Sequence, residues 1–275
     1  MLFRSCPMMN VLNGGRHAAN NIDVQEFMFM PVGADTFSEG MRMGVECYRA
    51  LHDLLSEKKL TTSVGDEGGF APNLGSDIQA LEFLVRAIEH AGWKVGEDVS
   101  IAIDAAAGEW QAEEGYFLPK KQEKRTRDEL IDHYVQLCKD FPLISIEDPL
   151  GEEDFKGFRK ITEKLGGDVM IVGDDLFTTN AGRLLKGIEA DAGNAILIKP
   201  NQIGTLTETL ETIQLARTAG YRVILSHRSG DTESSFIADL AVAVNADCIK
   251  SGAPARSERL AKYNRLLRIA EDLEG

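Results

Sequence analysis

A short apolar run, a polar cluster and an amphipathic stretch recur in that order from about residue 99 onward. This alternation is typical of β-α units, which build a parallel sheet. The strands that it predicts are VSIAID (99–104), PLISIED (142–148), DVMIVGDD (168–175), NAILIKP (194–200), YRVILSHRS (221–229) and ADCIKSG (246–252). We therefore expect six β-α units in this part of the chain.

The first hundred residues follow a different order. Two strand-like runs, VLNGG and VQEFMFMPVG, precede two helical stretches, TFSEGMRMGVECYRALHDLLSEKK and DIQALEFLVRAIEHAG. Two strands added to six give eight, the number that closes an α/β barrel, and 275 residues is a usual size for one such barrel. The prediction is an α/β fold, a TIM-type barrel with ββαα(βα)6 order, in a single domain over residues 1–275.

Two of the expected helices carry terminal signals. Thr126 is followed three residues later by Glu129, which predicts a capping box at the start of the helix in TRDELIDHYVQLCKDF. The stretch TLTETLETIQLARTAG ends on Gly220, which predicts a left-handed cap at its carboxyl end.

The charge balance limits the classes of partner. The formal net charge is −14 and the pI about 4.9, so the long-range field repels polyanions, and neither a nucleic acid nor an anionic membrane is an expected partner. No run approaches the roughly 18 consecutive apolar residues of a membrane span. The four scattered cysteines lack metal-ligand spacing and suit a reducing compartment; they are Cys6, Cys47, Cys138 and Cys248. The expected location is cytoplasmic.

In α/β barrels the chemistry lies at the carboxyl ends of the strands. The last polar residues of the six apolar runs are Asp104, Glu147, Asp174, Lys199, His227 with Arg228 and Ser229, and Lys250. Their separations of 43, 27, 25, 28 and 23 residues correspond mostly to one β-α unit each, so the side chains should meet at one end of the barrel. One charged strand end is usually only solvated, but that reading does not explain a charge at the end of every run.

The first three of these residues are carboxylates. Asp104, Glu147 and Asp174 have no Cys or His partner at ligand spacing, which favours a hard cation with oxygen ligands, and Mg²⁺ fits best. Asp175 stands beside Asp174, and neighbouring strand residues point to opposite faces. Which of the two faces the expected site therefore stays open.

The later strand ends carry cations. Lys199, Arg228 and Lys250 match an anionic ligand, with Arg228 suited to a bidentate contact and Ser229 adding a hydroxyl donor. A chain that is acidic as a whole thus carries a locally positive site.

Two loops contribute further candidates. Glu67 stands in Gly65–Gly69, and His17, Gln25 and Glu26 stand in NGGRHAANNIDVQEF. On these fragments alone, an ordinary glycine turn and an ordinary loop histidine explain the residues equally well.

Several longer motifs together resemble the enolase family, the phosphopyruvate hydratases. The matching segments run in the family's order from Pro7 to about Ile269: PMMNVLNGG, QEFMFMPVGA, VGDEGGFAPN, SIEDPL, GDDLFTTN, LIKPNQIGT, LSHRSG, IADLAVA and IKSGAPARSERLAKYNRLLRI. So many motifs in order are far more specific than one glycine fingerprint. The family's barrel begins strand, strand, helix, helix, in agreement with the order read above.

The resemblance implies Mg²⁺-dependent, reversible dehydration of 2-phosphoglycerate to phosphoenolpyruvate, a glycolytic step. It implies Asp104, Glu147 and Asp174 as Mg²⁺ ligands, Lys199 as general base and Glu67 as proton donor. The implied substrate contacts are His17, Gln25, Glu26, Arg228, Ser229 and Lys250, to which we add the strand-end residue His227. A Lys or His base with one or two Mg²⁺ ions is a known property of the superfamily and not something that these spacings show.

The chain also departs from the family pattern. Family members carry a further N-terminal domain, which supplies a mobile loop, a serine for a second Mg²⁺ and much of the contact of the homodimer; we expect this chain to be the barrel without that capping domain, which puts the dimer contact in question. MLFRSC is expected to be an unusual leader, Asp231 replaces a glutamate, and AIDAAAGEW is a variant around Asp104.

Two alternatives to the active enzyme follow. One is a catalytically impaired enolase barrel that lacks its lid and only binds metal or partners. The other is a sugar-acid dehydratase or racemase of the same superfamily, which the motifs SHRSG and GDEGG disfavour.

Overall fold

Eight strands join in a closed barrel in the computed structural model, which describes residues 5–274. Their order around the barrel is β1-β10-β9-β8-β7-β6-β3-β2. The strands are β1 (Cys6–Asn13), β2 (Glu26–Met30), β3 (Ser100–Asp104), β6 (Leu143–Glu147), β7 (Met170–Gly173), β8 (Ala195–Ile198), β9 (Arg222–Ser226) and β10 (Cys248–Lys250). The predicted α/β barrel is confirmed, and so is its ββαα beginning.

The helices follow the strands as expected. They are α1 (Phe37–Glu57), α2 (Asp77–His90), α3 (Arg127–Asp140), α4 (Phe155–Leu165), α5 (Ala181–Glu189), α6 (Pro200–Ile203), α7 (Leu206–Thr218), α8 (Phe236–Ala243) and α9 (Ser257–Glu274), with a short 3-10 helix η1 (Ala107–Trp110). No helix in residues 5–274 is long and apolar enough to cross a bilayer.

The chain divides into two compact units. Unit 1 comprises Met1–Ala102 and Leu225–Gly275, and unit 2 comprises Ile103–Ile224, so the division falls inside β3 and β9. The expectation of one domain over residues 1–275 stays a prediction. The first residues of the expected leader, MLFR, lie outside the described residues, as does Gly275. For Ser5 and Cys6 the prediction of a leader is wrong, because Ser5 is buried and Cys6 begins β1.

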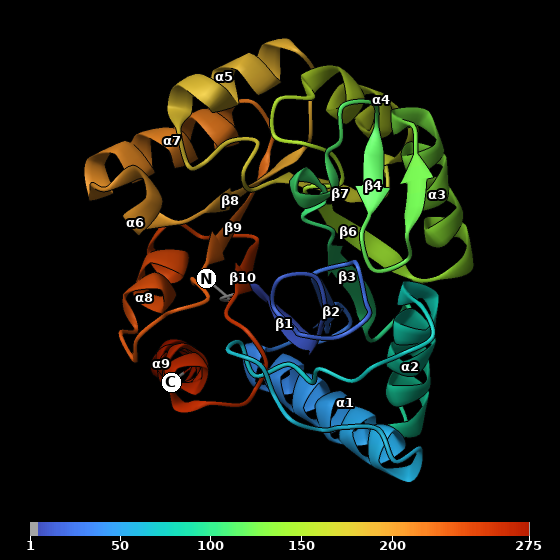
Figure 1. Ribbon diagram of the computed structural model, residues 1–275. Coiled ribbons are helices and arrows are strands. Elements are labelled where there is room, and N and C mark those ends of the chain that lie inside the picture. Colours follow the sequence, from blue (N-terminus) through green and yellow to red (C-terminus); the bar gives the residue numbers. More distant parts are fainter. Residues whose placement is uncertain (1–4, 275) are drawn as a thin grey trace. The chain divides into compact units, whose positions relative to one another are not determined.

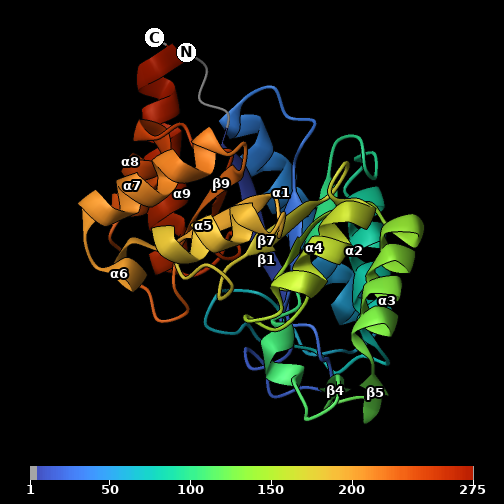
Figure 2. The same ribbon diagram turned by 90° about the horizontal axis from the view of Figure 1, so that it is seen from above.

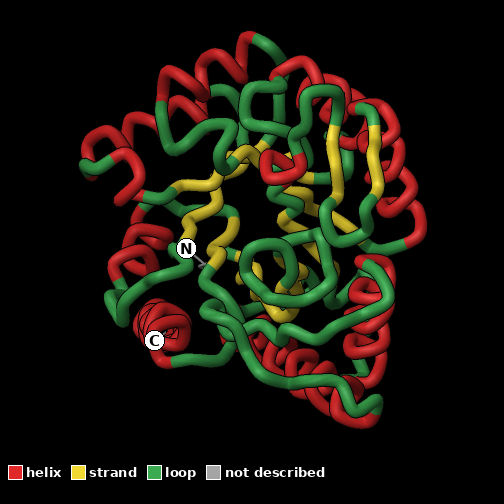
Figure 3. Tube along the Cα trace, in the orientation of Figure 1, coloured by secondary structure: helices red, strands yellow, loops and turns green. Residues whose placement is uncertain are grey.

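In unit 1, β1 pairs with β10 in parallel and with β2 in antiparallel. Helix α1 packs against α2, β1 and α9, and α8 packs against α9 and β10 (Figure 1). All five residues of β2 are buried, as are the residues of β1 after the first. Two long loops connect these elements, one from β1 to β2 and one from α1 to α2 (Figure 3).

In unit 2, β6, β7 and β8 pair in parallel. Their apolar runs are buried with few interruptions, as in parallel strands covered on both faces. Helix α3 packs against α4, and α5 packs against α7; the hairpin β4 (Tyr116–Leu118) and β5 (Glu123–Arg125) contacts α3 (Figure 2). This hairpin and η1 lie in the interval of 43 residues between Asp104 and Glu147, which explains its extra length.

Seven of the eight predicted strands are longer than the observed ones, whereas the run VLNGG is shorter than β1, which begins already at Cys6. The run DVMIVGDD was expected as one strand, but β7 ends at Gly173, and NAILIKP contributes only β8. Parallel strands end where their backbone groups stop pairing, and the polar residues after them turn away from the sheet. The candidate residues Asp174 and Lys199 therefore lie just beyond strands rather than within them.

Both predicted helix caps are confirmed. Gly220 follows α7 with φ +79°, a conformation that favours glycine. At the start of α3, Thr126 Oγ1 accepts from the backbone N–H of Glu129 at 3.2 Å, and Glu129 Oε2 accepts from the backbone N–H of Thr126 at 2.8 Å.

Removing the capping hydroxyl should destabilise α3. The change Thr126→Ala leaves a helix N–H without its acceptor, and we expect it to lower the free energy of unfolding by about 1 kcal/mol in denaturant titrations. The exposed Gln136→Ala on the same helix is the control and should change that energy by less than about 0.5 kcal/mol. Equal effects of the two changes would contradict the capping role.

Candidate functional site

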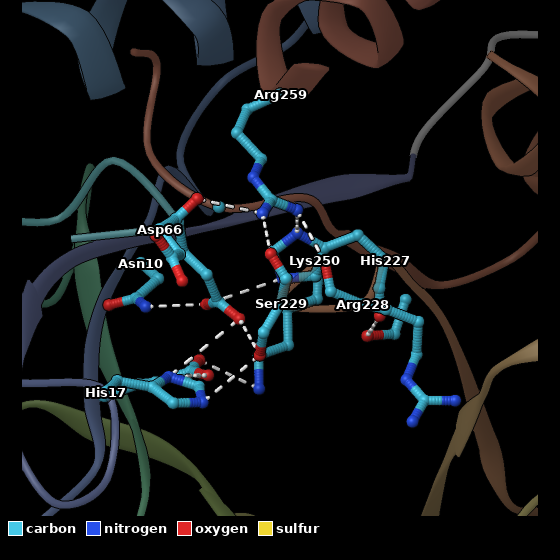
Figure 4. A network of polar contacts seen from close by, with 12 residues as sticks. Asn10, His17, Asp66, His227, Arg228, Ser229, Lys250 and Arg259 are labelled. Carbon is cyan, nitrogen blue, oxygen red and sulfur yellow. Dashed lines mark hydrogen bonds and ion pairs between the residues drawn. The ribbon is translucent and has the colours of Figure 1, made fainter. Parts of the chain in front are cut away.

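Unit 1 gathers polar side chains from its strand ends and loops. Asn10 comes from β1, His17 and Glu26 from the β1-β2 connection and the first residue of β2, and Glu67 from the α1-α2 loop. The remaining members follow or end β9 and β10. We call Asn10, His17, Glu26, Glu67, His227, Ser229 and Lys250 the Glu67 cluster (Figure 4).

The antiparallel pairing of β2 explains why residues at the start of a strand join a strand-end site. Glu26 pairs in register with Asn13, the last residue of β1. The start of β2 therefore lies at the same end as the carboxyl ends of β1 and β10. Glu26 is at the start of its strand, so a search of strand ends alone would not have found it. It was found from the motif that contains it.

Glu67 is one of the two buried acids of this cluster and is 3% exposed. Oε2 accepts from Asn10 Nδ2 at 2.8 Å and lies 3.5 Å from His227 Nε2, and Oε1 accepts from Ser229 Oγ at 3.1 Å. Burial by itself raises the pKa of Glu67, but His227, His17 and Lys250 outweigh burial and hold the pKa well below its ordinary value. Glu67 is therefore a carboxylate among donors.

Lys250 and Glu26 form a buried ion pair next to it. Lys250 Nζ lies 2.9 Å from Glu26 Oε2, with side chains only 3% and 2% exposed. His17 Nδ1 lies 3.3 Å from Glu26 Oε1, and His17 Nε2 lies 3.3 Å from Ser229 Oγ. A charge removed from water is tolerated only when it is paired, so each member depends on the other.

The ligand atoms of His17, Glu26 and Glu67 lie within 4.8 Å of one another, close enough to surround a cation. The Lys250 ammonium, however, already contacts Glu26 and repels a second positive charge. This part of the unit suits proton transfer and anion binding better than a metal.

The other two candidates of unit 1 adjoin the cluster in sequence. Gln25 is half-buried and directly precedes β2, and Arg228 is exposed between His227 and Ser229. In Figure 4 the Arg228 side chain extends away from the other labelled residues. A substrate contact at either residue stays a prediction.

In unit 2, Lys199 follows β8 and Asp174 follows β7. Lys199 Nζ lies 2.5 Å from Asp174 Oδ2, with side chains 15% and 12% exposed. The backbone N–H of Lys199 donates to Thr179 Oγ1 at 2.9 Å, and Pro200 begins α6 directly behind it. The buried strand on one side and the fixed φ of proline on the other hold the lysine backbone in place.

Asp148 shapes the turn that carries Asp174. Its Oδ1 accepts from the backbone N–H of Asp174 at 2.9 Å, and its Oδ2 accepts from that of Asp175 at 2.8 Å. Burial, followed by the charges of Asp174 and Asp104, raises the pKa of Asp148 well above its ordinary value. Asp174 is buried and Asp175 exposed because of this turn, and not because of strand alternation.

The carboxylates of unit 2 fit a hard cation. Asp148, Asp174 and Asp175 each have an oxygen within 4.8 Å of the others, but both Asp148 oxygens already accept backbone N–H groups, which leaves Asp174 and Asp175 as the more available of the three. Asp174 Oδ1 is buried and has no hydrogen-bond partner among the described residues, so an acceptor remains for an incoming group. Oxygen ligands alone are typical of Mg²⁺ sites.

The other two predicted ligands end neighbouring strands. Asp104 ends β3 and is 4% exposed, and its Oδ1 accepts from the backbone N–H of Ala106 at 2.9 Å. Glu147 ends β6 and is 1% exposed. The ligand set Asp104, Glu147 and Asp174 stays a prediction.

Three residues in or next to these sites were not predicted from the sequence. Asn10 is a polar residue inside an apolar strand, and Asp148 directly follows Glu147 in SIEDPL. Both positions carried a sequence signal that could have marked them as candidate site residues. Arg259 carried none, because a basic residue near the start of a helix is usually exposed. It is 1% exposed and contacts His227.

The low pKa of Glu67 predicts a pH-dependent contribution to stability. A carboxylate whose pKa lies below 4.5 when folded stabilises the fold above pH 4.5, and this contribution is lost as the pH falls through the folded pKa. The difference in free energy of unfolding between the wild type and Glu67→Gln should thus be largest near neutral pH and shrink below about pH 4.5. A difference that stays constant on acidification would contradict the assignment.

Comparison with known proteins identifies the family. The model of the family described as "Enolase, C-terminal TIM barrel domain" matches residues 3–275. The chain is 56% identical over 269 residues to the enolase of Natranaerobius thermophilus, covering 98% of this chain and 63% of that protein. It is 55% identical over 268 residues to the enolase of Acidothermus cellulolyticus, covering 98% of this chain and 62% of that protein.

The chain thus spans less than two thirds of the length of these relatives. The family match extends over nearly the whole chain, and the strand order agrees with a barrel. By its sequence and its fold, this chain belongs to the enolase family as a C-terminal TIM barrel domain.

Proposed function

We propose that the chain carries out the reversible, Mg²⁺-dependent dehydration of 2-phosphoglycerate to phosphoenolpyruvate. The observation that carries the proposal is the partly buried contact of 2.5 Å between Lys199 and Asp174, at the ends of two neighbouring parallel strands of an enolase-family barrel. The relatives' name supports the reaction, and the glycolytic role and the cytoplasmic location rest on the same similarity.

Lys199 is the proposed general base. Removing a proton next to a carboxylate builds a second negative charge on the substrate, and a lysine can accept that proton only in its neutral form. The contact with Asp174 favours the ammonium form. Catalysis therefore requires that the negative charge of Asp174 be compensated by something other than Lys199.

Asp174, with Asp104 and Glu147, would hold Mg²⁺. When bound, the ion supplies positive charge that stabilises the anion formed on the substrate. Asp174 Oδ1 supports this role, because it has no hydrogen-bond partner in the described part of the chain, while Lys199 contacts Oδ2.

Glu67 is the proposed proton donor for the departing hydroxyl. Its low pKa favours the carboxylate, which suits the reverse direction, where it takes a proton from the water that adds to phosphoenolpyruvate. In the dehydration direction it must first carry a proton. The donors around it, Asn10 and Ser229, hold the carboxylate in one orientation in both directions.

The proposed substrate contacts supply positive charge and hydrogen bonds for a small phosphorylated acid. They are His17, Gln25, Glu26, Arg228, Ser229, Lys250 and His227. Lys250 is the buried cation of this set, and Arg228 is exposed and offers a bidentate fork.

A second candidate function rests on the carboxylates Asp148, Asp174 and Asp175, which could hold a metal ion whether or not the chain turns over a substrate. In this case the chain binds Mg²⁺ or a partner without turnover. Dimer formation is expected from the family. Analytical ultracentrifugation would measure the oligomeric state independently of activity.

The test is phosphoenolpyruvate formation from 2-phosphoglycerate by the purified chain, with Mg²⁺ or with EDTA. We expect EDTA to abolish turnover and Lys199→Ala to lower kcat at least about 100-fold, because the proton acceptor is lost. Lys186→Ala, a half-exposed lysine paired with Glu153, is the matched control and should retain activity.

Turnover that is indifferent to both EDTA and Lys199→Ala would refute the proposal. Mg²⁺ binding measured by calorimetry without any turnover would instead establish the second candidate.

A further inference from the structure

We propose that Arg259, on α9, is a positioning residue. It holds His227 and the Glu67 loop, the part of the α1-α2 loop around Glu67, in the arrangement needed for proton exchange at Glu67. The inference rests on the proposed function, in which Glu67 is the proton donor. Arg259 does not touch the Glu67 carboxylate in the contacts described above, and acts through the backbone and through His227.

The guanidinium joins two segments that are far apart in sequence. Nη2 donates to the carbonyl of Asp66 at 2.9 Å, directly before Glu67, and to the carbonyl of Ser229 at 2.5 Å. Nη1 donates to the carbonyl of Arg228 at 2.7 Å. Figure 4 shows the side chain reaching from its helix toward both segments. The planar fork of arginine is suited to several fixed acceptors at once.

The same group sets the tautomer of His227. Nη1 of Arg259 lies 2.6 Å from His227 Nδ1, and a guanidinium can only donate. Nδ1 must therefore accept, and the ring hydrogen sits on Nε2. Nε2 is the nitrogen that lies 3.5 Å from Glu67 Oε2, so Arg259 makes His227 present an N–H to the carboxylate.

The end of β10 is shaped around this arrangement. The backbone N–H of Ala253 donates to the carbonyl of Glu67 at 2.8 Å. Gly252 has φ +77°, and a Cβ there would lie 2.6 Å from that carbonyl and 3.0 Å from Arg259 Cδ. The close approach of Arg259 to the Glu67 loop therefore requires glycine at this position.

Lys262 provides an internal comparison. It stands on the same helix, is equally buried at 1%, and its Nζ donates to the carbonyls of Thr232 and Glu258 and lies 3.3 Å from Asp231 Oδ1. Its described contacts therefore hold the stretch after Ser229 and include neither His227 nor Asp66. Both side chains hold the segment that follows β9. Of the two, Arg259 also contacts His227 and the carbonyl of Asp66, which lie next to Glu67.

The first test measures the tautomer directly. In the ¹⁵N-histidine-labelled chain at about pH 8, where an ordinary imidazole is neutral, long-range ¹H–¹⁵N spectra distinguish protonated from bare ring nitrogens. His227 is assigned by the signal that His227→Gln removes from the five histidines. We expect an excess of at least about tenfold of the Nε2–H form in the wild type.

Variants separate positioning from folding. Arg259→Met should reduce that excess, whereas Lys262→Met should lower the melting temperature and leave the tautomer unchanged. Arg259→Lys keeps the charge but loses the fork, so it should recover the tautomer only in part. If Arg259→Met does not fold, the wild type and Arg259→Lys decide.

The kinetic test follows the same comparison. Arg259→Lys should lower kcat for phosphoenolpyruvate formation by about 10- to 100-fold with KM changed less than about threefold, because a misplaced group slows the reaction more than it weakens binding. An Nδ1–H or doubly protonated His227 in the wild type, or the same tautomer excess in folded Arg259→Met, would overturn the proposal. A wild type without turnover would refute the proposed function alone, since the tautomer measurement does not depend on activity.

Discussion

The arrangement of unit 1 depends on the Glu67 carboxylate, because a negative charge taken out of water is stable only among donors. Asn10 and Ser229 donate to it directly, and His227 lies within 3.5 Å. These donors come from β1 and from the segment after β9. The hydrogen bonds to one carboxylate therefore hold two parts of the chain together that are distant in sequence. The burial that makes this charge costly without donors also strengthens the hydrogen bonds that the donors form with it.

In unit 2 a buried carboxylate, Asp148, accepts hydrogen bonds from backbone N–H groups instead of side chains. Asp148 accepts from the N–H groups of Asp174 and Asp175, and that turn directs Asp174 inward toward Lys199. One oxygen of Asp174, Oδ2, then contacts Lys199, and the other, Oδ1, has no hydrogen-bond partner within residues 5–274. A carboxylate in this state can accept a metal ion without breaking a hydrogen bond at that oxygen, which is why the proposed Mg²⁺ role and the Lys199 contact are compatible.

Much of the fold was readable from the sequence because hydrophobic periodicity and turn residues act locally. The eight strands, the two early helices, the Thr126 capping box and the Gly220 cap were all predicted. The β4-β5 hairpin was not, because YFL and EKR are short and alternate too little to signal strands. The strand ends were placed too late because backbone pairing, and not side-chain polarity, decides where a strand stops.

For the site, the sequence by itself determined the family and the candidate residues at the strand ends and in the loops, such as Lys199 and Glu67. Spacing and motifs are properties of the chain alone. Only the tertiary structure decided that Asp148 holds the Asp174 turn and that Arg259 is buried against His227. The physical reason is that hydrogen bonds between residues 26 or 32 positions apart depend on how segments pack, and no local pattern records that packing.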